Sequence, residues 1–253
     1  MYILTFIFGT LIGSFLNVCI YRIPREESIA YPSSHCPKCS TPLKWDNLIP
    51  VLSFLLQKGK CRYCGESISP QYPIVELLNG ILYAIFFHFY GLLIDFFFYS
   101  SIVSILIVIS LIDYYHQIIP DSLVIIIFII TIIHKLTLFI LYKTPFNLMN
   151  SILALLLGGG LFLVIAIVSK GGMGGGDIKL ISVLGFMLGI KKLLLNILLS
   201  FIIGAVFSVF LLLLNKKGKK DAIPFGPFIN IAFIVTLFFG DRIINWYVLR
   251  FLV

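Results

Sequence analysis

Long apolar runs recur along this chain, and they restrict its fold more than any other feature. Most have roughly 17 to 25 residues, the length at which a helix crosses the hydrocarbon core of a bilayer. The chain is 60% apolar and only 12% charged, too few charges to cover a soluble domain. We therefore expect an all-α, polytopic transmembrane protein of about eight helices. The expected segments are approximately 2–20, 74–90, 93–113, 122–141, 149–168, 178–190, 193–214 and 224–240.

One sizeable polar stretch, Tyr21 to Pro73, interrupts this pattern. It holds every cysteine except Cys19, and its many prolines disfavour a long helix. We divide the chain into a first transmembrane helix at 1–20, a cytoplasmic four-cysteine loop at 21–73 and a membrane core at 74–253. No basic residue precedes the first apolar run, so we expect that run to be retained as a helix and not cleaved as a signal.

Basic residues predict how the helices are oriented. Arg22 and Arg25 follow the first run, which places the N-terminus outside and the polar loop inside. Counting crossings puts the connections 113–121, 169–177 and 215–222 inside as well. The last of these carries Lys216, Lys217, Lys219 and Lys220, whereas Lys143, Lys191 and Lys192 fall outside, against the rule. We read the net charge of +8 as this topology signal, and without a long basic arm we expect no nucleic-acid partner.

Two acidic residues lie at the predicted inner ends of apolar runs. Asp113 closes the run SILIVISLID, and Asp177 follows the glycine-rich turn GGMGGGD. An Asp at mid-bilayer costs about 2.5–3.5 kcal/mol, so acids in such runs tend to be functional. Two close carboxylates can share one proton, so that one activates water while the other polarises a carbonyl. The pair therefore predicts an aspartyl protease with Asp113 and Asp177 as its catalytic residues.

Other roles are open for the acids near these ends. Asp177 also suits a helix N-cap, and Asp113 an interfacial position. Asp121, which follows Pro120, suits capping as well as catalysis. The glycines before Asp177 permit backbone angles that other residues avoid, which would let a substrate strand approach or let the helix shift. These glycines are Gly171, Gly172, Gly174, Gly175 and Gly176.

The cysteines of the polar loop have the spacing of a metal site. Cys36-x-x-Cys39 and Cys61-x-x-Cys64 form two pairs, and two such pairs complete a tetrahedral zinc site. A loop of this size has too little core to fold alone, so a structural metal would supply folding free energy. The alternatives are two disulfides or redox-active pairs, which a cytoplasmic location and the absence of a thioredoxin-like pattern disfavour.

Several sequence phrases together resemble the type IV prepilin peptidases, which are GxGD-type intramembrane aspartyl proteases. GGMGGGDIKL contains Gly-x-Gly-Asp, and LIDYYHQIIPD resembles the first aspartate motif of that family. The phrases GSFLNVCIYRIPR, CPKC, PLKWDNLIPVLSFL, CRYCGESISPQYPIVELLNG and IPFGPF are also similar, in order along nearly the whole chain. Gly-x-Gly-Asp alone occurs in other proteases, but its combination with a four-cysteine loop is specific.

The resemblance implies an endopeptidase that removes the basic leader of prepilins or pseudopilins at the cytoplasmic face of the bacterial inner membrane. Such enzymes serve type IV pilus assembly and protein secretion. Many also N-methylate the new terminus with S-adenosylmethionine, an activity tied to the cysteine loop; this chain has no glycine-rich Rossmann motif. The carried-over residues are Asp113 and Asp177 as catalytic pair, Gly174 and Gly176 as motif glycines, and Asp121, Lys179 and Glu76 in supporting roles.

Three other functions compete with this one. Another intramembrane aspartyl protease, of the preflagellin or presenilin type, would lack the four-cysteine insertion. A proton- or ion-coupled transporter would use Asp113 and Asp177 as carriers, and helices broken near mid-membrane would favour it. A zinc-dependent membrane scaffold would have no catalysis. If activity required one of the two aspartates but not the other, the transporter or the scaffold would be favoured over a protease.

Overall fold

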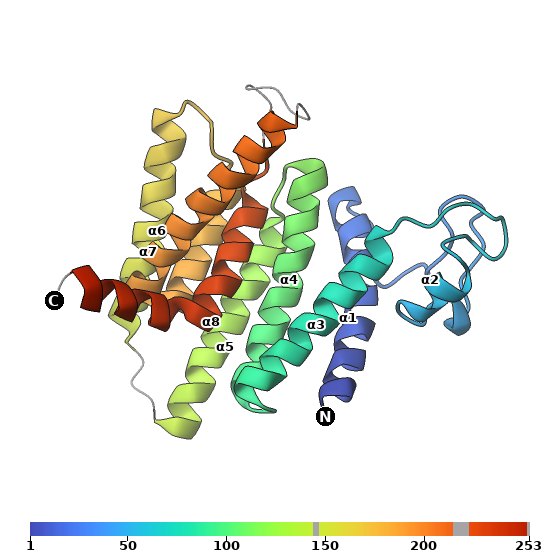
Figure 1. Ribbon diagram of the computed structural model, residues 1–253, viewed down its shortest axis with the longest axis horizontal. Helices are drawn as coiled ribbons and strands as arrows, with labels where there is room; N and C mark the ends of the chain where they lie inside the picture. Colours follow the sequence, from blue (N-terminus) through green and yellow to red (C-terminus); the bar gives the residue numbers. More distant parts are fainter. Residues whose placement is uncertain (144–146, 215–222, 252–253) are drawn as a thin grey trace. The chain divides into compact units, whose positions relative to one another are not determined.

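The computed structural model describes residues 1–143, 147–214 and 223–251, the last without its side chain. Helices dominate this part of the chain, and the only β-structure in it is two isolated bridges in the polar loop, His35–Pro42 and Lys60–Ser67. The long helices are α1 (Tyr2–Arg22), α3 (Gln71–Tyr90), α4 (Ile94–His116), α5 (Asp121–Tyr142), α6 (Leu148–Val168), α7 (Gly175–Leu213) and α8 (Gly226–Phe251). Short elements of the loop are η1 (Ile23–Arg25), η2 (Trp45–Asn47) and α2 (Leu52–Leu56) (Figure 1).

Within the described residues, seven helices are long and apolar enough to cross a membrane. Their outward surfaces carry large apolar side chains, such as Ile125 on α5 and Leu156 on α6, which suit contact with lipid. The expectation of a polytopic helical membrane protein is therefore confirmed. The lysine-rich connection that was predicted inside, with Lys216, Lys217, Lys219 and Lys220, lies outside the described residues.

The eight expected segments are present as seven helices because two of them form one element. The segments 178–190 and 193–214 are the two limbs of α7, which bends at Gly189. At this residue the backbone has φ 74° and ψ 171°, a conformation that is open to glycine and strained for other residues. The side-chain oxygen of Asn150 on α6 accepts the N–H of Ile190, at 3.3 Å, just after the bend.

The chain divides into two compact units, Met1–Val108 and Ile109–Val253, with the boundary within α4. In the first unit α1 packs along α3. A Cβ on Gly9 would lie 2.9 Å from the Cα of Gly80, so the two backbones approach closely where both residues are small. Asn79 is fully buried there, donates to the carbonyl of Gly9 at 2.7 Å and accepts from Ser104 at 2.9 Å. Its polar groups are thus satisfied inside an apolar region.

In the second unit α6 lies along α7, and α7 also packs against α8 and α5 (Figure 1). Small residues again permit the close approach. A Cβ on Gly185 of α7 would lie 2.8 Å from the carbonyl oxygen of Ala154, and one on Gly158 of α6 would lie 3.2 Å from that of Ile181. This packing fixes the first limb of α7, whose N-terminus carries Asp177.

Candidate active site and metal centre

Asp113 lies in the last turns of α4, where its side chain is held by the start of α8. The residue is 5% exposed, and its Oδ2 accepts the backbone N–H of Gly226 at 2.9 Å. Gly226 is the first residue of α8, so the carboxylate meets the positive end of that helix. A Cβ at Gly226 would lie 2.7 Å from the same Oδ2, so this contact requires glycine.

Asp177 lies in the first turn of α7 and faces inward. It is 8% exposed, and its Oδ1 is buried without a hydrogen-bond partner. The N-cap residue of α7 is Gly174, so Asp177 is not itself the N-cap; as the third residue of the helix, its carboxyl group interacts with the Gly174 backbone, which is a capping contact. A buried carboxylate oxygen without a partner is costly in a folded protein, and in an enzyme it is an available acceptor or proton carrier.

The two carboxyl groups lie close enough to interact electrostatically. Ile119, in the connection between α4 and α5, lies next to the start of α7, which carries Asp177, and the start of α8, which contacts Asp113. A Cβ on Gly176 would lie 2.7 Å from the Cβ of Ile119, and one on Gly226 would lie 3.3 Å from its Cδ1. The structure therefore brings Asp113, Asp177, Gly176 and Gly226 together around one isoleucine.

The motif glycines act mainly through lack of a side chain. Gly174 has an extended backbone with φ −72°, and a Cβ there would lie 3.1 Å from Oδ2 of Asp177. Gly176 must accommodate Ile119, whereas a Cβ on Gly175 would meet nothing within 4 Å. In this turn only Gly171 among the glycines has a positive φ, at 93°. The expectation of unusual backbone angles is therefore met at Gly171. Gly174 and Gly176 are instead explained by the close approach of Asp177 and Ile119 to their backbones.

Asp121 and Lys179 pair with each other at the surface. The ammonium of Lys179 lies 2.7 Å from both carboxylate oxygens of Asp121, and both side chains are more than half exposed. The N-cap of α5 is Pro120, and Asp121 makes no capping hydrogen bond, so its predicted capping role is not seen. The pair links α5 to α7, and an exposed ion pair of this kind contributes about 0–1 kcal/mol.

Glu76 connects the polar loop to α3. It is 7% exposed, and its Oε2 accepts the N–H of Val51 at 2.7 Å. Val51 has φ 62° and ψ −49°, and the N–H of Leu52 donates to the carbonyl of Pro50 across it at 2.6 Å. This tight turn is strained for a β-branched residue, so the buried carboxylate holds the loop in a conformation that it would otherwise leave.

The four loop cysteines form one cluster. Their sulfur atoms all lie within 4.8 Å of one another. The two pairs have the same backbone pattern: the N–H of Cys36 donates to Thr41 at 3.0 Å and that of Cys61 to Glu66 at 2.7 Å, five residues on in each case. Each pair is thus a tight knuckle that turns both sulfurs to one side. Such a cluster can hold a metal ion, and the cysteines are Cys36, Cys39, Cys61 and Cys64.

The thiols of this cluster do not all ionise alike. Hydrogen bonding with the Thr41 side chain and backbone lowers the pKa of Cys39 to about 6. The pKa of Cys64 is raised to about 12, because burial and the three neighbouring sulfurs outweigh the lowering by the Glu66 backbone N–H. Holding all four cysteines as thiolates would therefore require a compensating cation, which a bound metal would supply.

Two residues of the candidate active site were missed from the sequence, Ile119 and Gly226. Ile119 belongs to the Ile-Pro-Asp phrase and Gly226 to the phrase IPFGPF, both of which were noted only as resemblances. A glycine between Phe225 and Pro227 carries no signal of the carboxylate that it meets, because that contact joins helices far apart in the sequence.

Comparisons with known proteins match most of the chain to one protein family. Residues 7–90 match the bacterial peptidase A24 N-terminal domain, and residues 100–209 match the type IV leader peptidase family. The chain is 39% identical to a prepilin leader peptidase/N-methyltransferase of Bacillus subtilis, with 96% of each chain covered. Proteins of the same name from Legionella pneumophila and Pseudomonas aeruginosa are 35% and 33% identical, over 98% and 96% of this chain and 94% and 92% of their own. No solved structure matches.

Proposed function

Because the chain belongs to the type IV leader peptidase family, we propose that it is a membrane aspartyl endopeptidase that cleaves the basic leader from prepilins or pseudopilins. The observation that carries this proposal is the buried pair of carboxyl groups, Asp113 and Asp177, from α4 and α7. Proteolysis by such a pair requires no metal and no nucleophilic side chain.

The surroundings of the two carboxyl groups favour different roles. Asp113 accepts an N–H at the start of α8, and this contact stabilises negative charge. Asp177 has a buried oxygen without a partner, which suits the protonated member of a pair. We therefore assign the general base, which draws a proton from the attacking water, to Asp113. Asp177 then donates a hydrogen bond to the scissile carbonyl.

The transporter alternative gains no support from the comparisons, which match a protease family. α7 is broken, as some transporter helices are, but the break at Gly189 is about 18 Å along the helix from Asp177. Asp177 lies at the start of α7 and Asp113 near the end of α4, and neither lies at the break.

We propose zinc as the metal of the cysteine cluster. Four sulfurs within 4.8 Å are close to the spacing of about 3.8 Å that Zn–S bonds of about 2.3 Å produce in a tetrahedral site. A single cluster of four sulfurs favours a metal over two separate disulfides. Zinc bound by Cys36, Cys39, Cys61 and Cys64 would tie the two knuckles together and so fold the loop.

Methylation of the new N-terminus is proposed from the names of the relatives. The pocket around Gly189 does not fit S-adenosylmethionine, because Lys191 and Lys192 in its lining repel a sulfonium and no aromatic side chain lines it. A methylated product would show that the cofactor binds in another part of the enzyme.

We place the protein in the bacterial cytoplasmic membrane, with the cysteine loop and both aspartates facing the cytoplasm. This proposal rests on the crossing count and on Arg22 and Arg25 after the first apolar run. Green fluorescent protein fused after Gln117 should therefore fluoresce. Activity of an alkaline phosphatase fusion at the same residue would place this connection outside and reverse the topology.

The function is tested by co-expression with a type IV prepilin, followed by mass spectrometry of the pilin N-terminus. The wild type should remove the leader, and an added methyl mass would identify the second activity. Asp113→Asn should leave the leader in place. Asp95→Asn, at the opposite end of α4, is the matched control and should cleave normally. Failure of the wild type to process any prepilin tried, although it inserts in the membrane, would refute the proposal.

A further inference from the structure

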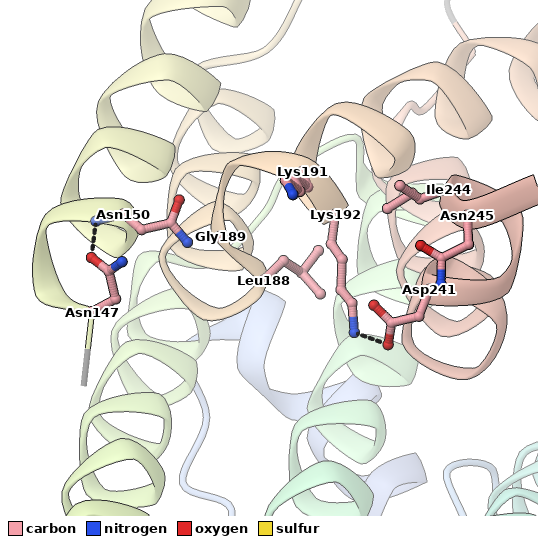
Figure 2. A pocket seen from close by; sticks show the side chains of 9 residues that line it. All are labelled: Asn147, Asn150, Leu188, Gly189, Lys191, Lys192, Asp241, Ile244 and Asn245. Carbon is pink, nitrogen blue, oxygen red and sulfur yellow. Dashed lines mark hydrogen bonds and ion pairs between the residues drawn. The ribbon is translucent and has the colours of Figure 1, made fainter. Parts of the chain in front are cut away.

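A polar pocket of about 510 Å³ surrounds the break of α7. Three helices line it: α6 with Asn147 and Asn150, α7 around Gly189, and α8 with Asp241 and Asn245. Figure 2 shows these side chains arranged around the bend. The two lysines of α7 lie between the two asparagines on one side and Asp241 and Asn245 of α8 on the other. Neither aspartate of the candidate active site takes part in it.

The shape of the pocket is fixed by hydrogen bonds at the bend. Asn147 is the N-cap of α6, and its side-chain oxygen accepts the N–H of Asn150 at 3.0 Å (Figure 2). Asn150 in turn accepts the N–H of Ile190, and a Cβ on Gly189 would lie 2.5 Å from its Nδ2. The bend and the α6 terminus therefore hold each other, so the pocket exists before any ligand binds.

The charge of the pocket is positive. Lys192 forms an ion pair with Asp241 at 2.8 Å, visible in Figure 2, and these two charges compensate each other. Lys191 has no ion-pair partner among the residues that the structure describes. Its ammonium, with the amide donors of Asn147 and Asn245, faces a space without a second acid. This set of donors is suited to a phosphate group.

The pocket lies inside the expected hydrocarbon core, toward the face opposite the aspartates. The limb Gly175–Leu188 connects the candidate active site to the pocket and is about 20 Å long, shorter than the hydrocarbon core of about 30 Å. Lysines at this depth require polar neighbours, which are supplied when headgroups and water move inward. On the proposed topology, such a site gives Lys191 and Lys192 a role on the side where the positive-inside rule disfavours them.

We propose that the pocket around Gly189 binds the phosphate group of an anion, supplied by an acidic phospholipid of the leaflet opposite the aspartates or by free phosphate. Lys191 provides the attracting charge, and Asn147 and Asn245 donate hydrogen bonds. Lys192 and Asp241 form the wall of the site. The bound group would hold the start of α6, the bend of α7 and the last turns of α8 together at that face.

The test is native mass spectrometry of the full-length protein in detergent, titrated with phosphatidylglycerol. Lys191→Gln should bind it about fivefold more weakly, the factor that one basic residue contributes at an anionic surface. The matched control is Lys143→Gln. It removes a charge at the end of α5, on the same side as the pocket but outside its lining, and should bind as the wild type does.

Addition of inorganic phosphate distinguishes the two sources of the anion. Displacement of the lipid by millimolar phosphate supports a site for phosphate itself, and persistence of the lipid supports a site for the whole headgroup. The thermal unfolding midpoint of lipid-free Lys191→Gln should equal that of the wild type, which excludes a folding defect. Equal lipid binding by Lys191→Gln and wild type, or equal losses in Lys191→Gln and Lys143→Gln, would overturn the proposal.

Discussion

Gly226 is the residue whose replacement tests the geometry around Asp113 most sharply. In Gly226→Ala the new methyl group would lie 2.7 Å from Oδ2 of Asp113 and 3.3 Å from Cδ1 of Ile119. The first distance is well inside van der Waals contact, so the carboxylate must move and its 2.9 Å hydrogen bond to the Gly226 N–H is lost. The predicted consequence is a misplaced catalytic base in a protein that still folds.

The size of the effect follows from this one hydrogen bond. A hydrogen bond to a charged group contributes about 1.5–3 kcal/mol. At about 1.4 kcal/mol per factor of ten, its loss lowers kcat/KM by about 10- to 150-fold. Stability should change little, because alanine favours a helix over glycine by about 1 kcal/mol and so offsets part of the strain.

The assay is cleavage of a purified prepilin by the enzyme in nanodiscs, followed by mass spectrometry over time. Gly160→Ala is the matched control, because a Cβ at this α6 residue meets nothing within 4 Å. It should cleave at the wild-type rate. Cleavage by Gly226→Ala within about twofold of the wild type would refute the argument that this amide positions Asp113.

Three further predictions follow from the same site and from the loop. Gly176→Ala should lose most cleavage because its methyl would lie 2.7 Å from an isoleucine side chain, whereas Gly175→Ala should keep it; equal activity of the two would contradict the close-packing account. Cys61→Ser should lower the bound zinc, measured by inductively coupled plasma mass spectrometry, and expose the loop to trypsin; unchanged zinc would exclude the four-sulfur site. Glu76→Gln weakens a charge-assisted hydrogen bond to Val51, so tryptic cleavage of the loop should accelerate several-fold, and an unchanged rate would exclude this anchor.

The helical membrane fold was predictable because apolar run length alone indicates a spanning helix. The expected run at 149–168 corresponds to α6 (Leu148–Val168), and that at 122–141 to α5 (Asp121–Tyr142). That the expected segments 178–190 and 193–214 form one bent helix was not predictable in the same way. A glycine such as Gly189 permits either a loop or a sharp bend, and packing against Asn150 decides between them.

The candidate site was predictable only in part. Spacing identified the cysteines because ligands for one metal come from short, local turns. Asp113 and Asp177 were paired through a crossing count and a family resemblance, both of which concern the whole chain. The contacts of Gly226 join positions 113 residues apart, and no local pattern encodes such a distance. The ion pair between Asp121 and Lys179, on α5 and α7, escaped prediction for the same reason.

The central claim is that Asp113 and Asp177 act as one catalytic unit, and single-turnover cleavage by their variants tests it most directly. Purified wild type, Asp113→Asn, Asp177→Asn and the double variant would be compared on one prepilin substrate. Residues that act as a unit are not additive, so each single variant should lose as much cleavage as the double variant. Substantial cleavage by either single variant, with the protein folded and inserted, would contradict the dyad.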